Sequence, residues 1–136
     1  MSSYRYLLDT NILSDFIKNP TGVAARKVAA PDIEPFCCTS LIVACELRYG
    51  VCKKGSPYLT ARVEQLLNTL PVLSPEENVA QHYGEIRTAL ERAGQPIEGN
   101  DLLIAAHARA LQLTVVTANL REFLRVPGLA VENWLE

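Results

Sequence analysis

The apolar residues of this chain fall into two patterns, short continuous runs and longer segments with helical spacing. The runs predict strands. These strands are expected at residues 4–8, 36–40, 71–74, 113–119 and 129–134. Segments with apolar residues three and four positions apart, together with a few shorter ones, predict helices. The helices are expected at residues 12–18, 21–30, 41–54, 57–70, 75–94, 99–112 and 120–124.

Serine and threonine residues precede several of the predicted helices. Thr39 or Ser40 is expected to cap the helix over 41–54, and Ser56 the next one. Ser74 can cap a helix that starts with a proline and has two glutamates in its first turn. These residues therefore mark the expected helix starts.

Strands that alternate with helices predict parallel pairing, with helices on both faces of the sheet. The fold class expected is α/β, a three-layer α/β/α sandwich with a central, mostly parallel sheet. The length of 136 residues is that of one ordinary domain, which we place at 1–136, and 49% hydrophobic residues with 21% charged ones are typical of a globular protein.

The composition also indicates the compartment in which the protein is expected and the kinds of partner it can bind. The chain has neither a secretory leader nor a run of apolar residues long enough for a membrane helix, so we expect a soluble, cytoplasmic protein without membrane contact. The four cysteines lie at 37, 38, 45 and 52 with no CxxC spacing, which favours reduced thiols acting as small apolar side chains. A net charge of −2 means that any nucleic-acid binding rests on local patches.

Three carboxylates stand in places where an interior or a strand end is expected. Asp9 directly follows the first strand and Asn119 lies just after "TVVT", so both belong at the edge where parallel strands end. Asp101 opens an apolar helix, and Glu46 shares a helix face with apolar residues. Carboxylates brought together repel unless a cation or a proton intervenes. Mg²⁺ or Mn²⁺ prefers oxygen ligands, and such ions assist phosphodiester hydrolysis.

Each acid also has an ordinary structural interpretation. Asp9 can cap the helix that follows it, and Asp101 suits the positive end of a helix dipole. Glu46 can form a surface ion pair with Arg48 or Lys53. No single residue distinguishes a nuclease from a protein with well-capped helices.

The blocks "LLDTNILSDFI", "SLIVACELRYG" and "NDLLIAAHARALQLTVVTANLREFLRVPGLAVENW" cover nearly the whole chain. In order and spacing they resemble a PIN-domain ribonuclease of the VapC type, the toxin component of a type II toxin–antitoxin system. The resemblance implies a Mg²⁺-dependent endoribonuclease that hydrolyses RNA, tRNA or another structured RNA, by means of a metal-activated water. It also implies a PIN-like fold.

The resemblance assigns roles residue by residue. Asp9, Glu46 and Asp101 match the family's catalytic and metal-binding acids. Asn119 stands where many PIN domains have a fourth acid, so the pocket loses one charge and some hold on a second metal ion. An amide oxygen is a neutral ligand, and asparagine at this position is familiar in the VapC-like branch, so the resemblance implies that Asn119 is a tuning difference rather than a loss of activity.

Polar and basic residues near these acids are candidates for supporting roles. Thr117, with Thr10 or Asn11, is expected to bind a carboxylate or a metal-bound water, unless these are plain strand-end and turn residues. Arg121 and Arg48 are candidates for RNA binding, although such charges are commonly solvated helix faces.

The resemblance further implies a homodimer and a VapB-like antitoxin whose C-terminal segment covers the active site. The apolar helix faces at 56–70 and 102–112 agree with such contacts, but ordinary core packing explains them too. Two other functions stay open. One is a catalytically silent PIN-like module that binds RNA or protein. The other is phosphoryl transfer through an aspartate, although Asn11 stands where such enzymes have a second acid.

Overall fold

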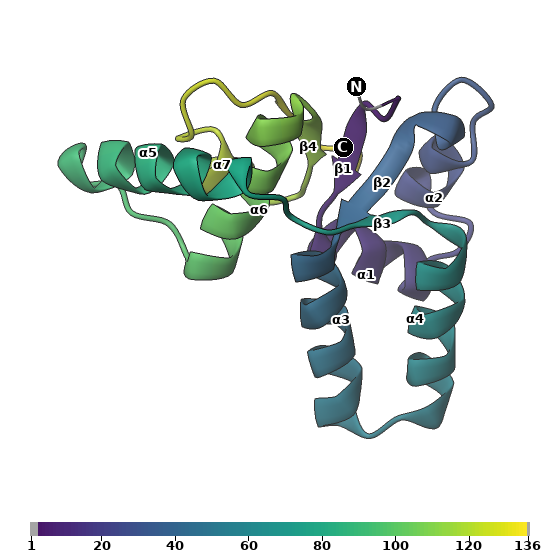
Figure 1. Ribbon diagram of the computed structural model, residues 1–136. Helices are drawn as coiled ribbons and strands as arrows, with labels where there is room; N and C mark the ends of the chain where they lie inside the picture. The colour runs from purple at the N-terminus through teal and green to yellow at the C-terminus, as the bar shows by residue number, and fades with distance from the viewer. Residues whose placement is uncertain (1–2, 136) are drawn as a thin grey trace.

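The computed structural model describes residues 3–135 of the chain. Five strands alternate with helices along it (Figure 1). The strands are β1 (Tyr6–Leu8), β2 (Cys37–Ser40), β3 (Val72–Leu73), β4 (Thr114–Val116) and β5 (Val131–Glu132). The helices are α1 (Thr10–Lys18), α2 (Val23–Val28), the 3₁₀ turn η1 (Glu34–Phe36), α3 (Leu41–Lys54), α4 (Pro57–Thr69), α5 (Asn78–Arg92), α6 (Gly99–Leu111) and α7 (Leu120–Phe123).

The strands form one sheet in the order β3-β2-β1-β4-β5, and every pairing is parallel. Figure 1 shows α5 and α6 on one side of the sheet and α1, α2 and α4 on the other. This arrangement confirms the expected α/β three-layer sandwich. Because β1 lies in the middle, its carboxyl end is flanked by the ends of β2 and β4, and all three strands deliver the following residues to the same edge of the sheet.

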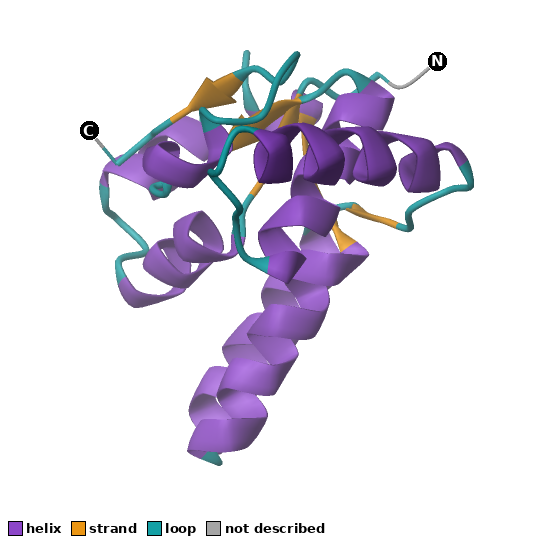
Figure 2. Cartoon of the chain, turned by 90° about the vertical axis from the view of Figure 1, so that its left-hand side faces the viewer, coloured by secondary structure: helices purple, strands orange, loops and turns teal. Residues whose placement is uncertain are grey.

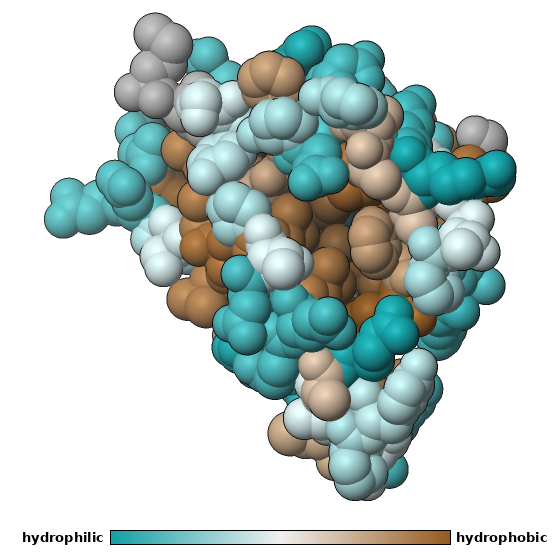
Figure 3. All heavy atoms as spheres, turned by 90° about the vertical axis from the view of Figure 1, so that its right-hand side faces the viewer, coloured by the Kyte–Doolittle hydropathy of each residue, from teal (hydrophilic) through white to brown (hydrophobic). Residues whose placement is uncertain are grey.

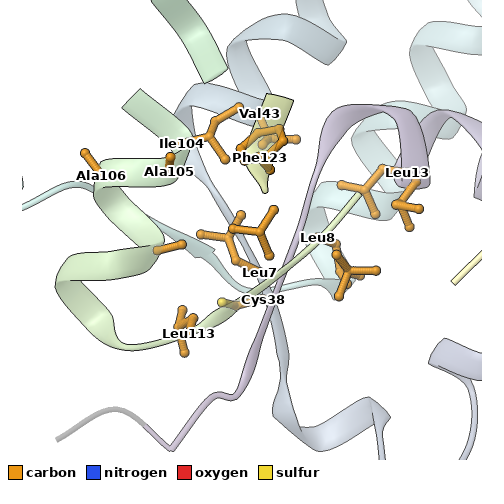
Figure 4. Packing of buried hydrophobic residues seen from close by; sticks show 14 of the residues in the cluster. Leu7, Leu8, Leu13, Cys38, Val43, Ile104, Ala105, Ala106, Leu113 and Phe123 are labelled. Carbon is orange, nitrogen blue, oxygen red and sulfur yellow. The ribbon is translucent and has the colours of Figure 1, made fainter. Parts of the chain in front are cut away.

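The core lies on both faces of the central strand. Leu7 and Leu8 of β1 point to opposite faces and are completely buried (Figure 4). Figure 4 shows Ile104 of α6 and Phe123 of α7 in the same packed cluster. Burying leucine or phenylalanine side chains contributes roughly 1.5–3 kcal/mol each. This cluster therefore holds α6 rigidly against the sheet.

The helix caps are as predicted at two positions. Ser40 Oγ accepts the Ile42 N–H at the start of α3, and Ser56 Oγ accepts the Leu59 N–H at the start of α4. The predicted start of α5 is wrong: the helix begins at Asn78, without a side-chain cap. The carbonyls of Glu76 and Glu77 instead form a tighter turn, accepting the amides three residues later, as the chain leaves the edge strand β3.

Helices α3 and α4 form an antiparallel hairpin that extends away from the body of the molecule (Figures 1 and 2). Gly55 ends α3 with a φ of 65°, a left-handed conformation that glycine adopts without strain. The base of α3 lies at the carboxyl edge of the sheet, so residues of its first turns stand near the end of β1.

The cysteines follow the prediction only in part. Cys37 and Cys38 of β2 are buried, and burial raises the pKa of the Cys38 thiol to about 12. Cys45 and Cys52 are exposed on α3, which contradicts the expectation of four buried apolar thiols. Their seven-residue spacing puts both on the outer face of the hairpin. Within residues 3–135, no helix has the length and hydrophobicity needed to cross a bilayer.

Candidate active site

Asp9 directly follows the carboxyl end of the central strand β1. Its backbone N–H donates to Val116 O of β4, and its carbonyl accepts from Leu13 in the first turn of α1. The side chain is 3% exposed and makes no capping hydrogen bond to α1. The capping interpretation of Asp9 is therefore wrong, because its carboxylate makes no capping hydrogen bond to α1 and lines a hollow at the edge of the sheet.

One carboxylate oxygen of Asp9 accepts hydrogen bonds and the other accepts none within the described chain. Thr117 Oγ1 donates to Asp9 Oδ2 at 2.8 Å, and Asn11 Nδ2 donates to the same oxygen at 3.3 Å. Asp9 Oδ1 is buried without a hydrogen-bond partner among residues 3–135. Burial raises the pKa of Asp9, and the nearby charge of Glu46 raises it further, while the Thr10 backbone N–H and the hydrogen bonds from Thr117 and Asn11 oppose the shift. An unsatisfied buried carboxylate oxygen is costly unless a ligand completes it.

Glu46 reaches the same edge from the second turn of α3. Thr10 Oγ1 donates to Glu46 Oε1 at 2.6 Å, and Asn100 Nδ2 donates to Oε2 at 3.4 Å. The suggested ion pair with Arg48 is absent, because Arg48 binds Glu64 through two hydrogen bonds of 2.9 Å. Thr10 on α1 and Asn100 on α6 thus hold Glu46 between two helices.

Asp101 lies in the first turn of α6, whose first amides are capped by Glu98. Burial, the neighbouring Glu122 carboxyl and the charge of Asp9 raise the pKa of Asp101 to about 8. Asn119 Nδ2 donates to Asp101 Oδ2 at 3.3 Å and to Glu122 Oε2 at 3.2 Å. A raised pKa is expected for carboxylates crowded together with no cation between them.

Glu122 is an acid of this site that the sequence did not predict. It lies in α7, three positions after Asn119, where a short helical turn brings it beside Asp101. The amide nitrogen of Asn119 joins these two acids, so Asn119 acts here as a donor and not as the oxygen ligand that was expected. Spacing within "ANLREF" gives the only signal for Glu122, because residues three apart share a helix face.

The predicted supporting residues all bind this set of acids. Thr117 and Asn11 hold Asp9, and Thr10 holds Glu46. Asn11 also donates to Thr117 Oγ1 at 3.2 Å and accepts the Ala118 N–H at 2.8 Å, so it joins the ends of β1 and β4. These polar side chains do more than end a strand or a turn.

The acids open into one hollow of about 550 Å³. Its lining residues are Asp9, Thr10, Asn11, Ser14, Asp15, Lys18, Glu46, Asp101, Asn119 and Leu135. Within the described chain no three acid, histidine or cysteine side chains are close enough to enclose a metal ion. The acids therefore form an open pocket and not a closed cage, which suits a cation that keeps part of its water shell.

The predicted RNA-binding arginines lie outside this hollow. Arg48 is paired with Glu64 on the hairpin, and Arg121 is exposed on α7. Neither lines the hollow, whose single basic lining residue among those described is Lys18. The sequence could not identify Lys18, because only the fold turns the end of α1 toward the acids.

A parallel sheet whose strand ends gather three carboxylates, with an unsatisfied oxygen on the central one, defines a nuclease-like α/β protein. The model of the PIN domain family matches residues 6–129. The Ribonuclease VapC2 of Rickettsia felis is 38% identical over 95% of this chain and 97% of its own length. The chain belongs to the PIN-domain family and, within it, to the VapC ribonucleases.

Other relatives agree with this assignment. The tRNA(fMet)-specific endonuclease VapC of Salmonella typhimurium is 38% identical over 96% of this chain and 98% of its own length. A crystal structure of DNA-bound VapBC from Salmonella typhimurium superposes with a TM-score of 0.87 at 36% identity, covering 96% of this chain and 98% of that one. A crystal structure of Rickettsia felis VapBC2 bound to a promoter DNA fragment gives a TM-score of 0.84.

Proposed function

We propose that this chain is a Mg²⁺-dependent endoribonuclease toxin in which Asp9, Glu46 and Asp101 bind the metal and the scissile phosphate of RNA. Mn²⁺ is the expected substitute, since both are hard cations that prefer oxygen ligands. The substrate class is tRNA or another structured RNA, in line with the tRNA(fMet)-specific activity for which the Salmonella typhimurium relative is named. We place the protein in the cytoplasm, where such RNA is found.

The observation that carries the proposal is the buried, unpartnered Oδ1 of Asp9 within a pocket of acids. A divalent cation fits this donor set, because it completes the coordination of that oxygen and offsets the repulsion between Asp9 and Asp101. When bound, such an ion supplies positive charge to the phosphate and lowers the pKa of a coordinated water.

The chain's own residues position the carboxylates for this task. Thr117 and Asn11 occupy Asp9 Oδ2, so Oδ1 is the oxygen left for a ligand. Asn100 and Thr10 fix Glu46 from two helices, which keeps it from swinging out to solvent. In the overall reaction a water oxygen forms a bond to phosphorus, the phosphorus–oxygen bond to one nucleoside breaks, and the released oxygen takes up a proton.

Cleavage of total cellular RNA with mapped ends tests the proposal. Wild-type protein is expected to cut at defined positions with Mg²⁺ and to stop with EDTA. Asp9→Asn, Glu46→Gln and Asp101→Asn are each expected to lower the rate by at least about 100-fold. Glu91→Gln, which changes a carboxylate paired with Arg87 on the surface of α5, is the matched control and keeps full activity. Full activity in all three acid variants contradicts the proposal, and RNA binding without cleavage by wild type indicates a silent PIN-like module instead.

The expected protein partner is a VapB-like antitoxin. An apolar hollow of about 240 Å³ adjoins the acid pocket and shares Thr10, Ser14, Lys18 and Glu46 with it. Its apolar walls come from Ile17, Leu47, Val51, Leu59 and Val63. Figure 3 shows hydrophobic residues in a hollow on this side of the molecule. An antitoxin segment with an apolar face and a basic side chain suits both neighbouring hollows.

A homodimer is the expected assembly of the toxin. The exposed aromatic residue Tyr58 of α4 and the exposed Leu103 of α6 lie on the two helices whose apolar faces were singled out in the sequence. Sedimentation of the purified toxin, alone and with its antitoxin, measures both assemblies. A monomer that binds no antitoxin contradicts this part of the proposal.

A further inference from the structure

Besides the apolar hollow described above, the acid pocket continues into another hollow past the end of α1, which we call the second hollow. This second hollow measures about 410 Å³, and Asp15, Lys18 and Leu135 line both. Its remaining wall is the loop between α1 and α2, residues 19–22, together with Val23 at the start of α2. A chain bound across the acids therefore has a continuous path over Lys18 and along this loop.

Lys18 is the one basic side chain that lines either hollow within the described part of the chain. It is exposed, and none of the ion pairs among residues 3–135 involves it. Its neighbour Asp15 is already engaged by Asn19 Nδ2 at 2.9 Å. The ammonium group is therefore available to an anion, in contrast to Arg48, which Glu64 occupies.

The loop that forms the wall is fixed before any ligand binds. Gly22 N–H donates to Asn19 O at 2.9 Å, and Gly22 O accepts from Arg26 N–H at 3.0 Å. A Cβ at Gly22 would stand 3.0 Å from the Asn19 Cβ and 3.1 Å from its carbonyl oxygen, so the turn is too tight for a side chain. Val23 at one rim is 48% exposed, and it offers an apolar surface beside the charge.

We propose that this second hollow, called here the flanking subsite, binds the nucleotide next to the scissile phosphate, with Lys18 contacting that nucleotide's phosphate and Val23 and Leu135 contacting its ribose or base. The inference rests on the proposed ribonuclease function. RNA carries a negative charge on every nucleotide, while the acids at the cleavage site repel it. The positive charge of Lys18 between the two hollows offsets this repulsion, so that RNA can bind across the acidic pocket.

Binding of a short fluorescein-labelled RNA of mixed sequence, followed by anisotropy in Mg²⁺, tests the flanking subsite. Asp101→Asn serves as the background, so that binding is measured without cleavage. In it, Lys18→Gln is expected to raise Kd about tenfold and to lower the slope of log Kd against log salt by about 0.7, the loss of one phosphate contact. Lys18→Arg restores most of the affinity. Lys53→Gln, which changes an exposed lysine over the Tyr49 ring on the hairpin, is the matched control and leaves Kd unchanged.

A second pair of variants tests the wall of the flanking subsite independently of Lys18. Val23→Asp puts a negative charge at the rim of the flanking subsite and is expected to weaken RNA binding. Tyr49→Asp puts the same charge on the exposed hairpin, where no effect is expected. In the cleaving protein, Lys18→Gln is expected to raise KM while kcat stays unchanged, because Lys18 does not touch the reacting atoms.

The outcomes separate the two proposals. Unchanged Kd and salt slope in Lys18→Gln, or no RNA binding in any variant, overturns the flanking subsite. Absence of Mg²⁺-dependent cleavage by the wild type overturns the ribonuclease proposal, and the binding measurements remain valid in that case.

Discussion

The hydroxyl of Thr117 determines which oxygen of Asp9 is free. It donates to Oδ2 at 2.8 Å while accepting the Asn119 N–H at 2.9 Å, so its one proton is committed to the carboxylate. Thr117→Val keeps the shape and removes the donor. We expect it to lower the free energy of unfolding by about 1–3 kcal/mol and to weaken Mg²⁺ binding about 10- to 100-fold.

Urea unfolding and a Mg²⁺ titration by calorimetry measure these two effects. Thr117→Ser, which keeps the hydroxyl, is the control and is expected to retain most of the metal affinity. Equal metal affinity in the valine variant would show that Asp9 needs no positioning partner.

Asp101 gives the metal-free protein a pH dependence. Its folded pKa of about 8 lies above the value of 3.8 for a free side chain, so the folded state holds the extra proton. Stability from this group is complete below about pH 4 and is lost as the pH rises toward 8, because over this range the folded state keeps its proton while the unfolded state does not, so a rising pH favours unfolding. In EDTA, the melting temperature is therefore expected to fall between pH 5 and pH 8.

Asp101→Asn, which has no proton to lose, is expected to flatten this fall, and added Mg²⁺ to reverse it in the wild type. Thermal melts at a series of pH values measure both. A wild-type melting temperature that rises over this pH range contradicts the raised pKa.

At this scale the sequence predicted the three acids and their three polar partners, but not Glu122 or Lys18. Asp9 directly follows β1 and Thr117 directly follows β4. Because these two strands are neighbours and run parallel, their ends meet at the same edge of the sheet, so the contact between the two residues follows from the topology. Lys18 stands at the last residue of α1, and its access to the pocket depends on the fixed turn after it. The local sequence pattern does not predict how that turn is oriented relative to the acids.

Two elements that carry acids are joined at Ser40. Its hydroxyl caps α3, which bears Glu46, and lies 2.8 Å from Nδ1 of the buried His107 of α6, which bears Asp101. Burial lowers the pKa of His107, so the ring is neutral at pH 7. Ser40→Ala is expected to lower the free energy of unfolding by about 1–3 kcal/mol, since it removes the cap and leaves a buried ring nitrogen unpaired.

The matched variant is Ser56→Ala, which removes a similar cap from the exposed end of α4 and is expected to cost about 0.5–1 kcal/mol. Urea unfolding compares the two. Equal costs would mean that the bond to His107 contributes nothing beyond the cap.

The helix starts at Ser40 and Ser56 were predictable because a cap is a local device, formed by one side chain and an amide two or three residues later. The start of α5 was not, although Ser74 and two glutamates favour a helix there. The chain at that point is still leaving β3, whose pairing with β2 fixes its direction. Tertiary pairing at the sheet edge thus outweighs a good capping sequence.

At the scale of the whole molecule, the end of the chain returns to its beginning. Trp134 is 1% exposed and packs edge-on against Tyr6 of β1, with ring centroids 4.9 Å apart. Lys27 of α2 stands over the other part of the indole, and Leu135 then lines the acid pocket. That the whole chain forms one domain stays a prediction, and this closure supports it.

Trp134→Ala tests how far the acid pocket depends on this closure. The cavity and the lost contacts are expected to lower the free energy of unfolding by about 3–5 kcal/mol, while Trp134→Phe is expected to lose less because an aromatic ring remains. Because Leu135 also lines the flanking subsite, RNA affinity is expected to fall in the alanine variant below the temperature at which it unfolds. Anisotropy with the labelled RNA, on protein shown to be folded by circular dichroism, measures that loss. An alanine variant that is destabilised yet binds RNA as the wild type does would separate the C-terminal segment from the binding path and limit its role to holding the sheet.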